Sequence, residues 1–231
     1  MRALLILIVV LMIALVVGDR VGVVMAQNEI GRKIAAEYDL PQQPGVEIGG
    51  FPFLTQAVDG NYRTIDIRIG DWSGQNISVH NLDVALTDVS APLSDVIANR
   101  TSNLVAGTAT ATALVPYDIV QSFAPAGVES ISYSPEGLRA TGTFSVAGIS
   151  VPAIVFVTVA PTDAGIEVTP VSVRPAAGGP TISLSLLRQA LTFTVPLRQL
   201  PLGARLTAIQ PGADGLHATA VAHDVRFDSL P

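Results

Sequence analysis

The pattern of hydrophobic and polar positions divides the chain into an apolar start, an amphipathic segment and a long series of strands. Residues 3–17 are apolar without a break, behind Arg2 and ahead of a Gly-Asp-Arg triplet. A run of 15 residues lies at the upper end of the range for a signal peptide core and just below the length of a spanning helix. The segment therefore predicts export, either as a leader cleaved after Gly18 or Ala26 or as a retained anchor.

This start sets the expected organisation of the whole chain. Positive charge before the run and balanced charge after it direct the remainder to the outer side of the membrane. We expect residues 1–18 to be a signal peptide or an N-terminal membrane anchor, and residues 19–231 to form a single domain. A core helix buried on all sides is the remaining interpretation of the apolar run.

An amphipathic pattern follows the apolar run. Val23, Ala26, Ile30 and Ile34 fall on one side of a helix from about residue 20 to residue 37, and charged residues fall elsewhere. A Tyr-Asp-Leu-Pro sequence ends this pattern. The apolar stripe predicts packing against a sheet, with the lining of a lipid groove as the alternative.

Strands dominate the middle of the chain. Residues 64–69 alternate isoleucine with polar residues, which is typical of a strand with one wet face. The parity of the apolar positions changes near His80, so we predict a β-bulge there. Residues 138–146 and 149–159 flank an Ala-Gly pair and predict a hairpin. Its second strand is apolar on both faces over residues 153–157, which places it at the centre of a sheet or beside an apolar cavity.

The other segments complete the expected fold class. Residues 107–113 alternate small side chains and predict a strand, and residues 204–227 predict strands around a Pro-Gly-Ala-Asp-Gly turn. Short helices are expected at residues 92–99, 116–123 and 184–191. Long antiparallel strands with few helices, and no regular βαβ alternation, predict an α+β fold.

Composition narrows the possible functions. Charged residues make up 14% of the chain and hydrophobic residues 49%, and the net charge is -6 without any run of Lys or Arg. Nucleic acid is therefore not an expected partner, because its binding depends on neutralising phosphates. The chain has no Cys and three scattered His, so we expect neither a metal site nor a cofactor.

Catalytic motifs are scarce. The G-x-S-x-G pattern is absent, and the Gly-Asp-Trp-Ser-Gly sequence at residues 70–74 has its serine one position late. Phosphate-loop and dinucleotide fingerprints are also missing. His223 and Asp224 can belong to a Ser-His-Asp arrangement assembled in space, with a solvated strand edge as the alternative.

One apolar loop follows the amphipathic segment. In the Gly-Gly-Phe-Pro-Phe-Leu sequence at residues 49–54, Gly and Pro keep two aromatic residues and a leucine out of regular structure. Phe51, Phe53 and Leu54 therefore either fill the core or form a tip that dips into a membrane.

The same segment resembles a known family. Residues 46–56, followed by Asn-Tyr and the isoleucine strand, resemble the LmeA-like phospholipid-binding family of actinobacterial cell-envelope proteins. Further segments resemble this family in the same order: residues 19–21, 89–95, 107–109 leading to 116–117, and 191–197 with 201–203. The resemblance implies a phospholipid-binding protein of the cell envelope, with a suggested link to phospholipase-type activity and lipoglycan assembly. It also implies a fold similar to tubular lipid-binding domains, in which a curved, mainly antiparallel sheet wraps around a long N-terminal helix.

Three functions fit these observations. The first is an exported or membrane-anchored protein that binds or transfers phospholipid on the outer side of the cytoplasmic membrane, with phospholipid or acyl chains and the membrane surface as partners. The second is a phospholipase or esterase, which needs a Ser or Asp nucleophile beside one of the histidines. The third is a purely structural anchored domain. For the first function, the candidate lipid-binding residues are Phe51, Phe53, Leu54, Ile30, Ile34, Phe156 and Phe193.

Overall fold

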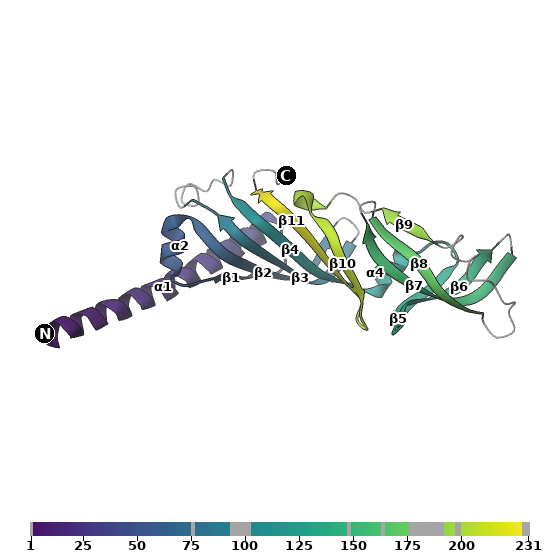
Figure 1. Ribbon diagram of the computed structural model, residues 1–231, viewed down its shortest axis with the longest axis horizontal. Helices are drawn as coiled ribbons and strands as arrows, with labels where there is room; N and C mark the ends of the chain where they lie inside the picture. Colours follow the sequence, from purple (N-terminus) through teal and green to yellow (C-terminus); the bar gives the residue numbers. More distant parts are fainter. Residues whose placement is uncertain are drawn as a thin grey trace.

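The computed structural model describes residues 2–74, 77–92, 103–146, 149–162, 165–175, 192–196 and 200–227. Within these ranges, a long N-terminal helix and two antiparallel sheets form an elongated molecule (Figure 1). The predicted α+β class with a curved, mainly antiparallel sheet is confirmed. The strands are divided over two sheets, and neither sheet closes into a barrel.

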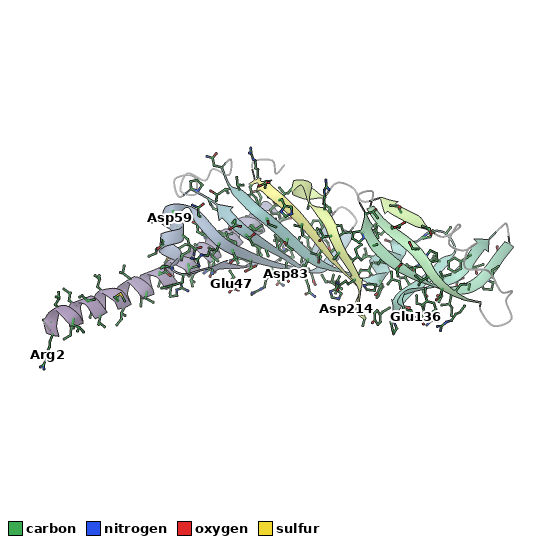
Figure 2. All side chains as sticks on the ribbon, viewed as in Figure 1. Arg2, Glu47, Asp59, Asp83, Glu136 and Asp214 are labelled. Carbon is green, nitrogen blue, oxygen red and sulfur yellow. The ribbon has the colours of Figure 1, made fainter. Side chains whose placement is uncertain are left out.

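Helix α1 (Arg2–Glu37) joins the apolar run and the amphipathic segment into one continuous helix. Residues 2–18 are exposed, and Arg2 lies at a free tip that points away from both sheets (Figure 2). Further along, Asp19, Val23 and Gly31 are buried. Val23, Ala26 and Ile30 of the predicted stripe pack in one core with residues of sheet A, which confirms the predicted packing against a sheet. The length and composition of α1 are sufficient for crossing a membrane, and they also suit a signal sequence.

Sheet A contains six strands in the order β1-β2-β3-β4-β11-β10. Its strands are β1 (Gly45–Gly49), β2 (Asn61–Gly74), β3 (Ile77–Ser90), β4 (Val105–Val115), β10 (Arg205–Pro211) and β11 (Leu216–Arg226). A short helix, α2 (Phe53–Asp59), connects β1 to β2. The pairing of β4 with β11 joins segments that lie far apart in the sequence.

Alternation along each strand decides which residues of sheet A are buried. Ile65 pairs with Ile48 on one side and with Leu86 on the other, and all three are buried. The strand predicted over residues 64–69 is therefore confirmed, with its isoleucines on the face that packs against α1. The predicted bulge is also confirmed, because the register between β3 and β4 shifts between His80 and Asp83.

Sheet B contains five strands in the order β5-β6-β7-β8-β9. Its strands are β5 (Val128–Ser134), β6 (Gly137–Val146), β7 (Ile149–Thr162), β8 (Gly165–Pro175) and β9 (Phe193–Pro196). The predicted hairpin is confirmed as β6 and β7, which pair from Leu138 opposite Val157 to Val146 opposite Ile149. Because β7 lies between β6 and β8, its two-sided apolar character belongs to a central strand.

Two hydrophobic cores hold these layers together. The first core lies between α1 and sheet A and contains Val23, Phe53, Ile65 and the other buried residues of that face. The second core joins the sheets, because Ile209 and Leu216 of sheet A pack with Leu138, Val155 and neighbouring residues of sheet B. The molecule is therefore continuous from α1 to the far end of sheet B (Figure 1).

Besides α2, two short helical segments lie between strands in the described part of the chain. The helix predicted over residues 116–123 is confirmed as α4 (Tyr117–Ser122), which begins directly after Pro116. A single turn, η1 (Pro201–Gly203), precedes β10. The helices predicted near residues 92–99 and 184–191 fall on segments that, except for residue 92, lie outside the described residues.

Candidate lipid-binding site

The predicted apolar loop lies against α1 just beyond the end of the apolar run. A Cβ atom added to Gly22 would be 3.5 Å from Leu54 and 3.6 Å from the Phe53 ring, so the small residue permits a close approach. Gln56 ties the loop to its neighbours: its Nε2 donates to the Gly49 carbonyl at 3.2 Å, and its Oε1 accepts from the Arg63 amide at 3.1 Å. We call this junction of α1, residues 49–53 and α2 the exit point, because the exposed part of α1 leaves the body here.

Asp19 connects the two helices at the exit point. Its side chain is only 3% exposed, and its Oδ1 accepts a hydrogen bond from the Leu54 amide at 2.8 Å. Its Oδ2 accepts a hydrogen bond from the Arg20 guanidinium at 2.6 Å. The residue at the start of α2, Pro52, supplies no side-chain cap. Asp19 therefore acts as the cap of α2 from another helix, and it satisfies an amide that the first turn leaves free.

The structure separates the three apolar residues of the predicted loop. Phe51 lies in the loop, whereas Phe53 and Leu54 lie in the first turn of α2, so the prediction that all three stay out of regular structure is wrong for Phe53 and Leu54. Phe53 is 6% exposed and belongs to the first core, where its ring centre lies 6.2 Å from that of Tyr62. Phe51 and Leu54 are 56% and 42% exposed. The Arg20 guanidinium lies 5.1 Å from the centre of the Phe51 ring, within the range of a cation–π contact. Phe53 therefore fills the core, whereas Phe51 and Leu54 remain available for contact with another molecule.

The face of sheet A that packs against α1 carries a second, less buried set of side chains. We call this set the apolar row. It crosses the sheet two residues along each strand from the buried row of Ile48, Ile65 and Leu86, and all its members are half-buried. The registers place these side chains side by side across six strands in the order Val46, Ile67, Val84, Ala111, Ala220 and Leu206. The row links the first core, which Val46, Ile67 and Val84 touch, to the second core, which Leu206 touches.

Two candidates from the helical stripe lie near this face. Ile30 is half-buried and packs against the first core, and Ile34 is half-buried one turn further along α1. Gly31 allows the helix to approach the loop after it, because a Cβ there would lie 2.7 Å from the Pro44 carbonyl oxygen. The structure therefore brings Ile30 and Phe53 together in one core.

The remaining two candidates lie in sheet B. Phe156 is 5% exposed, and its neighbours Val155 and Val157 point into the second core from the opposite face of β7. The Arg174 guanidinium lies 4.8 Å from the Phe156 ring centre and also pairs with Glu136 at 2.9 Å. Phe193 begins β9, and its side chain lies outside the described residues. These two residues are thus on a different sheet from the exit point.

Two shallow clefts lie in the described part of the chain. A cleft of about 390 Å³ is lined by Met25, Asn28, Glu29, Arg32 and Gln43. Another, of about 230 Å³, lies over β2, β3 and β4 and is lined by Asp66, Ile67, Arg68, Asp83, Val84, Ala85, Thr110 and Thr112. Charged and amide side chains contribute to both, so neither has the character of an apolar lipid pocket.

The three histidines take part in polar pairs at the surface. His80 Nδ1 lies 2.7 Å from Asp71 Oδ1, and His217 Nε2 lies 3.0 Å from Asp214 Oδ1. His223 is exposed on β11, and its Nδ1 lies 3.3 Å from the Thr108 hydroxyl. Among the described residues, no serine hydroxyl completes either His–Asp pair, and no cluster of three or more His, Cys, Asp or Glu side chains is placed to hold a metal ion.

Sequence reasoning missed two features of this region. Asp19 caps α2 through a hydrogen bond from the Leu54 amide, 35 residues away. No local sequence pattern predicts a cap that comes from another helix. The apolar row depends on the pairing of β4 with β11, whose alanines at positions 111 and 220 look unremarkable in the sequence. The alternation of small residues over 107–113 was the one signal that pointed towards it.

Comparison with known proteins identifies the family. The model of the LmeA-like phospholipid-binding family matches residues 17–221, which include the exit point, the apolar row and most of both sheets. Comparisons with curated proteins and with solved structures returned no match. Because the family match extends over most of the chain and agrees with the resemblance seen in the sequence, this protein belongs to the LmeA-like phospholipid-binding family.

Proposed function

We propose that this protein binds a phospholipid on the α1-facing side of sheet A, with an acyl chain along the apolar row, and that α1 holds it at the outer side of the cytoplasmic membrane. The family match over residues 17–221 is the observation that carries the proposal. Residues 19–231 act as one lipid-binding unit, and transfer of lipid within the envelope, in support of lipid or lipoglycan assembly, is the process they serve.

The apolar row has suitable dimensions and chemistry for an acyl chain. Six strands spaced by about 4.8 Å give the row a length of about 24 Å, which exceeds the roughly 15 Å thickness of one leaflet of hydrocarbon. All of its side chains are aliphatic, and its fourth and fifth members, Ala111 and Ala220, are the smallest because they end at Cβ. Half-burial means that apolar surface remains to be covered, which favours contact with a hydrocarbon chain.

The exit point supplies an entrance at one end of this face. Phe51 and Leu54 are exposed apolar residues beside α1, and Ile30 continues the apolar surface towards the sheet. A lipid that leaves a membrane along α1 meets these side chains before it reaches the row. This route assigns a role to the loop and helix candidates, while Phe156 and Phe193 remain predictions for sheet B.

A substitution that fills the apolar row with a bulky side chain tests the lipid-binding proposal. We expect Ala111→Phe to reduce the phospholipid that copurifies with the full chain, because the added ring occupies the centre of the row. Thr112→Phe, on the same strand but exposed on the opposite face, is the matched control and retains the lipid. Bound lipid is measured by mass spectrometry after organic extraction. Equal lipid content in both variants contradicts binding at the row.

The location is tested separately. A reporter that is active only outside the cytoplasm, fused after residue 231, is expected to be active, because the charges around the apolar run direct the domain outward. Activity of a reporter that works only in the cytoplasm contradicts the proposed location. The intact mass of the purified protein then distinguishes a retained anchor from cleavage after Gly18.

The alternative function is phospholipid hydrolysis, and one observation favours it. Asp71 contacts Nδ1 of His80, the nitrogen that the carboxylate holds in a Ser-His-Asp triad, and this leaves Nε2 for a hydroxyl. Ser73 lies two residues after Asp71 on β2, and Ser78 lies two residues before His80 on β3. Their hydroxyls are 2.8 Å apart. His80→Gln is expected to abolish hydrolysis of a labelled phospholipid if this pair is catalytic. Absence of hydrolysis by the unaltered chain excludes the alternative.

A further inference from the structure

Exposed apolar side chains lie on both sides of the exit point. On α1 these are Val21, Val24 and Met25, which are 49%, 53% and 68% exposed. On the loop and α2 they are Phe51, Leu54 and Val58, which are 56%, 42% and 75% exposed. We call these six residues the collar. Figure 1 shows that α2 lies beside α1 at the end of the body where the exposed part of the helix emerges.

The length of the apolar run explains why such a collar is needed. At 1.5 Å per residue, residues 3–17 measure about 22 Å, whereas the hydrocarbon core of a bilayer is about 30 Å thick. The run by itself is therefore about 8 Å short. If the apolar surface continues to Met25, the segment from residue 3 measures about 34 Å, which is sufficient.

The two charged residues within this longer segment are accommodated. The Asp19 side chain is 3% exposed, and its carboxylate faces the amide of Leu54 rather than the outside. The Arg20 side chain is 52% exposed and lies over the Phe51 ring, so its guanidinium can reach the phosphate level while its stem stays among apolar groups. Neither charge has to enter hydrocarbon unpaired.

A polar boundary marks where the collar ends. On α1, the residues that follow Met25 towards the C-terminal end include Asn28, Glu29 and Arg32. Glu29 and Arg32 form an exposed ion pair. On α2 the boundary is Asp59, which directly follows Val58 and is exposed (Figure 2). Both elements thus change from apolar to polar close to the exit point, as expected for a surface that meets the headgroup region of a bilayer.

We propose that the collar is a membrane-docking surface, which inserts into the boundary between headgroups and acyl chains of the bilayer that α1 enters. The collar extends the apolar surface of the run to the thickness of the hydrocarbon core, and it sets the distance between sheet A and the membrane. This inference rests on the proposed membrane location of the protein, but it does not depend on lipid binding at the apolar row.

The absence of cysteine from the chain allows a direct test of depth. The full chain carrying Val58→Cys is labelled with a nitroxide and reconstituted in vesicles of equal parts phosphatidylglycerol and phosphatidylcholine. Phe123→Cys is the matched control, because Phe123 is also apolar and 53% exposed but follows α4, away from the collar. Relaxation by oxygen, which concentrates in hydrocarbon, is compared with relaxation by a water-soluble nickel chelate.

We expect the ratio of oxygen to nickel accessibility to be several-fold higher at position 58 than at position 123. Equal ratios overturn the collar, because position 58 is then in water. A label at position 58 that is shielded from both reagents also overturns it, since a protein rather than lipid then covers the surface. Failure of the protein to float with the vesicles refutes the proposed membrane location itself, whereas flotation with a wet label at position 58 refutes only the collar.

Discussion

Phe51, in the loop, and Phe53, at the start of α2, should differ strongly in how much a substitution by alanine lowers the Tm. Phe53 is 6% exposed and packs in the first core beside Tyr62 and Gly22. Phe53→Ala removes a buried ring and leaves a cavity, which costs about 3–5 kcal/mol. For a domain of this size, 1 kcal/mol corresponds to about 2–4 °C in Tm. We therefore expect Phe53→Ala to lower the Tm by about 6–20 °C.

Phe51→Ala is the control for this prediction, because it removes the same ring two residues away. Phe51 is 56% exposed, and its contact with Arg20 is an exposed cation–π pair worth about 0.5–1 kcal/mol. The expected loss in Tm is therefore at most about 4 °C. Both variants are measured as full chains in the same detergent, by near-ultraviolet circular dichroism during heating. If Phe53→Ala melts within 4 °C of the unaltered chain, or if Phe51→Ala falls as far as Phe53→Ala, the assignment of Phe53 to the core is wrong.

Two further predictions concern α1. Gly31→Ala should lower stability by about 1–3 kcal/mol, because its Cβ would lie 2.7 Å from the Pro44 carbonyl oxygen, whereas Gly22→Ala, whose nearest neighbour would be at 3.5 Å, should leave the Tm unchanged or raise it. Asp19→Ala, which removes both acceptor oxygens, should speed hydrogen exchange at the Leu54 amide, measured by mass spectrometry of peptides from α2, and an unchanged rate would argue against the cap.

Local patterns in the sequence were sufficient to predict many of the elements. The alternation of isoleucine and polar residues over residues 64–69 predicted both the strand and its buried face, because neighbouring side chains of a strand point to opposite sides. The change of parity near His80 predicted the bulge for the same reason. These features depend only on neighbours along one strand, so a single sequence contains the information.

Features that depend on distant contacts were not predictable in the same way. The strands form two sheets instead of one, because β10 and β11 at the end of the chain return to β4 and leave β5 to β9 as a separate sheet. Phe51 and Phe53 have similar local surroundings in the sequence. Phe53 is buried because its ring packs against Gly22 of α1, more than 30 residues earlier in the chain, whereas the Phe51 ring is exposed. Candidate site residues chosen by hydrophobicity alone therefore combined core residues with surface residues.

The continuity of α1 has a mechanical consequence. The helix has no break between residues 2 and 37, a length of about 54 Å, and Asp19 and Val23 fasten it to the body. A domain on a flexible tether can swivel freely, but here the exposed part of α1 and the sheets turn as one rigid body. When α1 sits in a bilayer, a change of about 20° in its tilt, of the size that differences in bilayer thickness accommodate, rotates the whole body by the same angle. The far end of sheet B then sweeps the widest arc, so the thickness of the membrane decides how near that end comes to its surface.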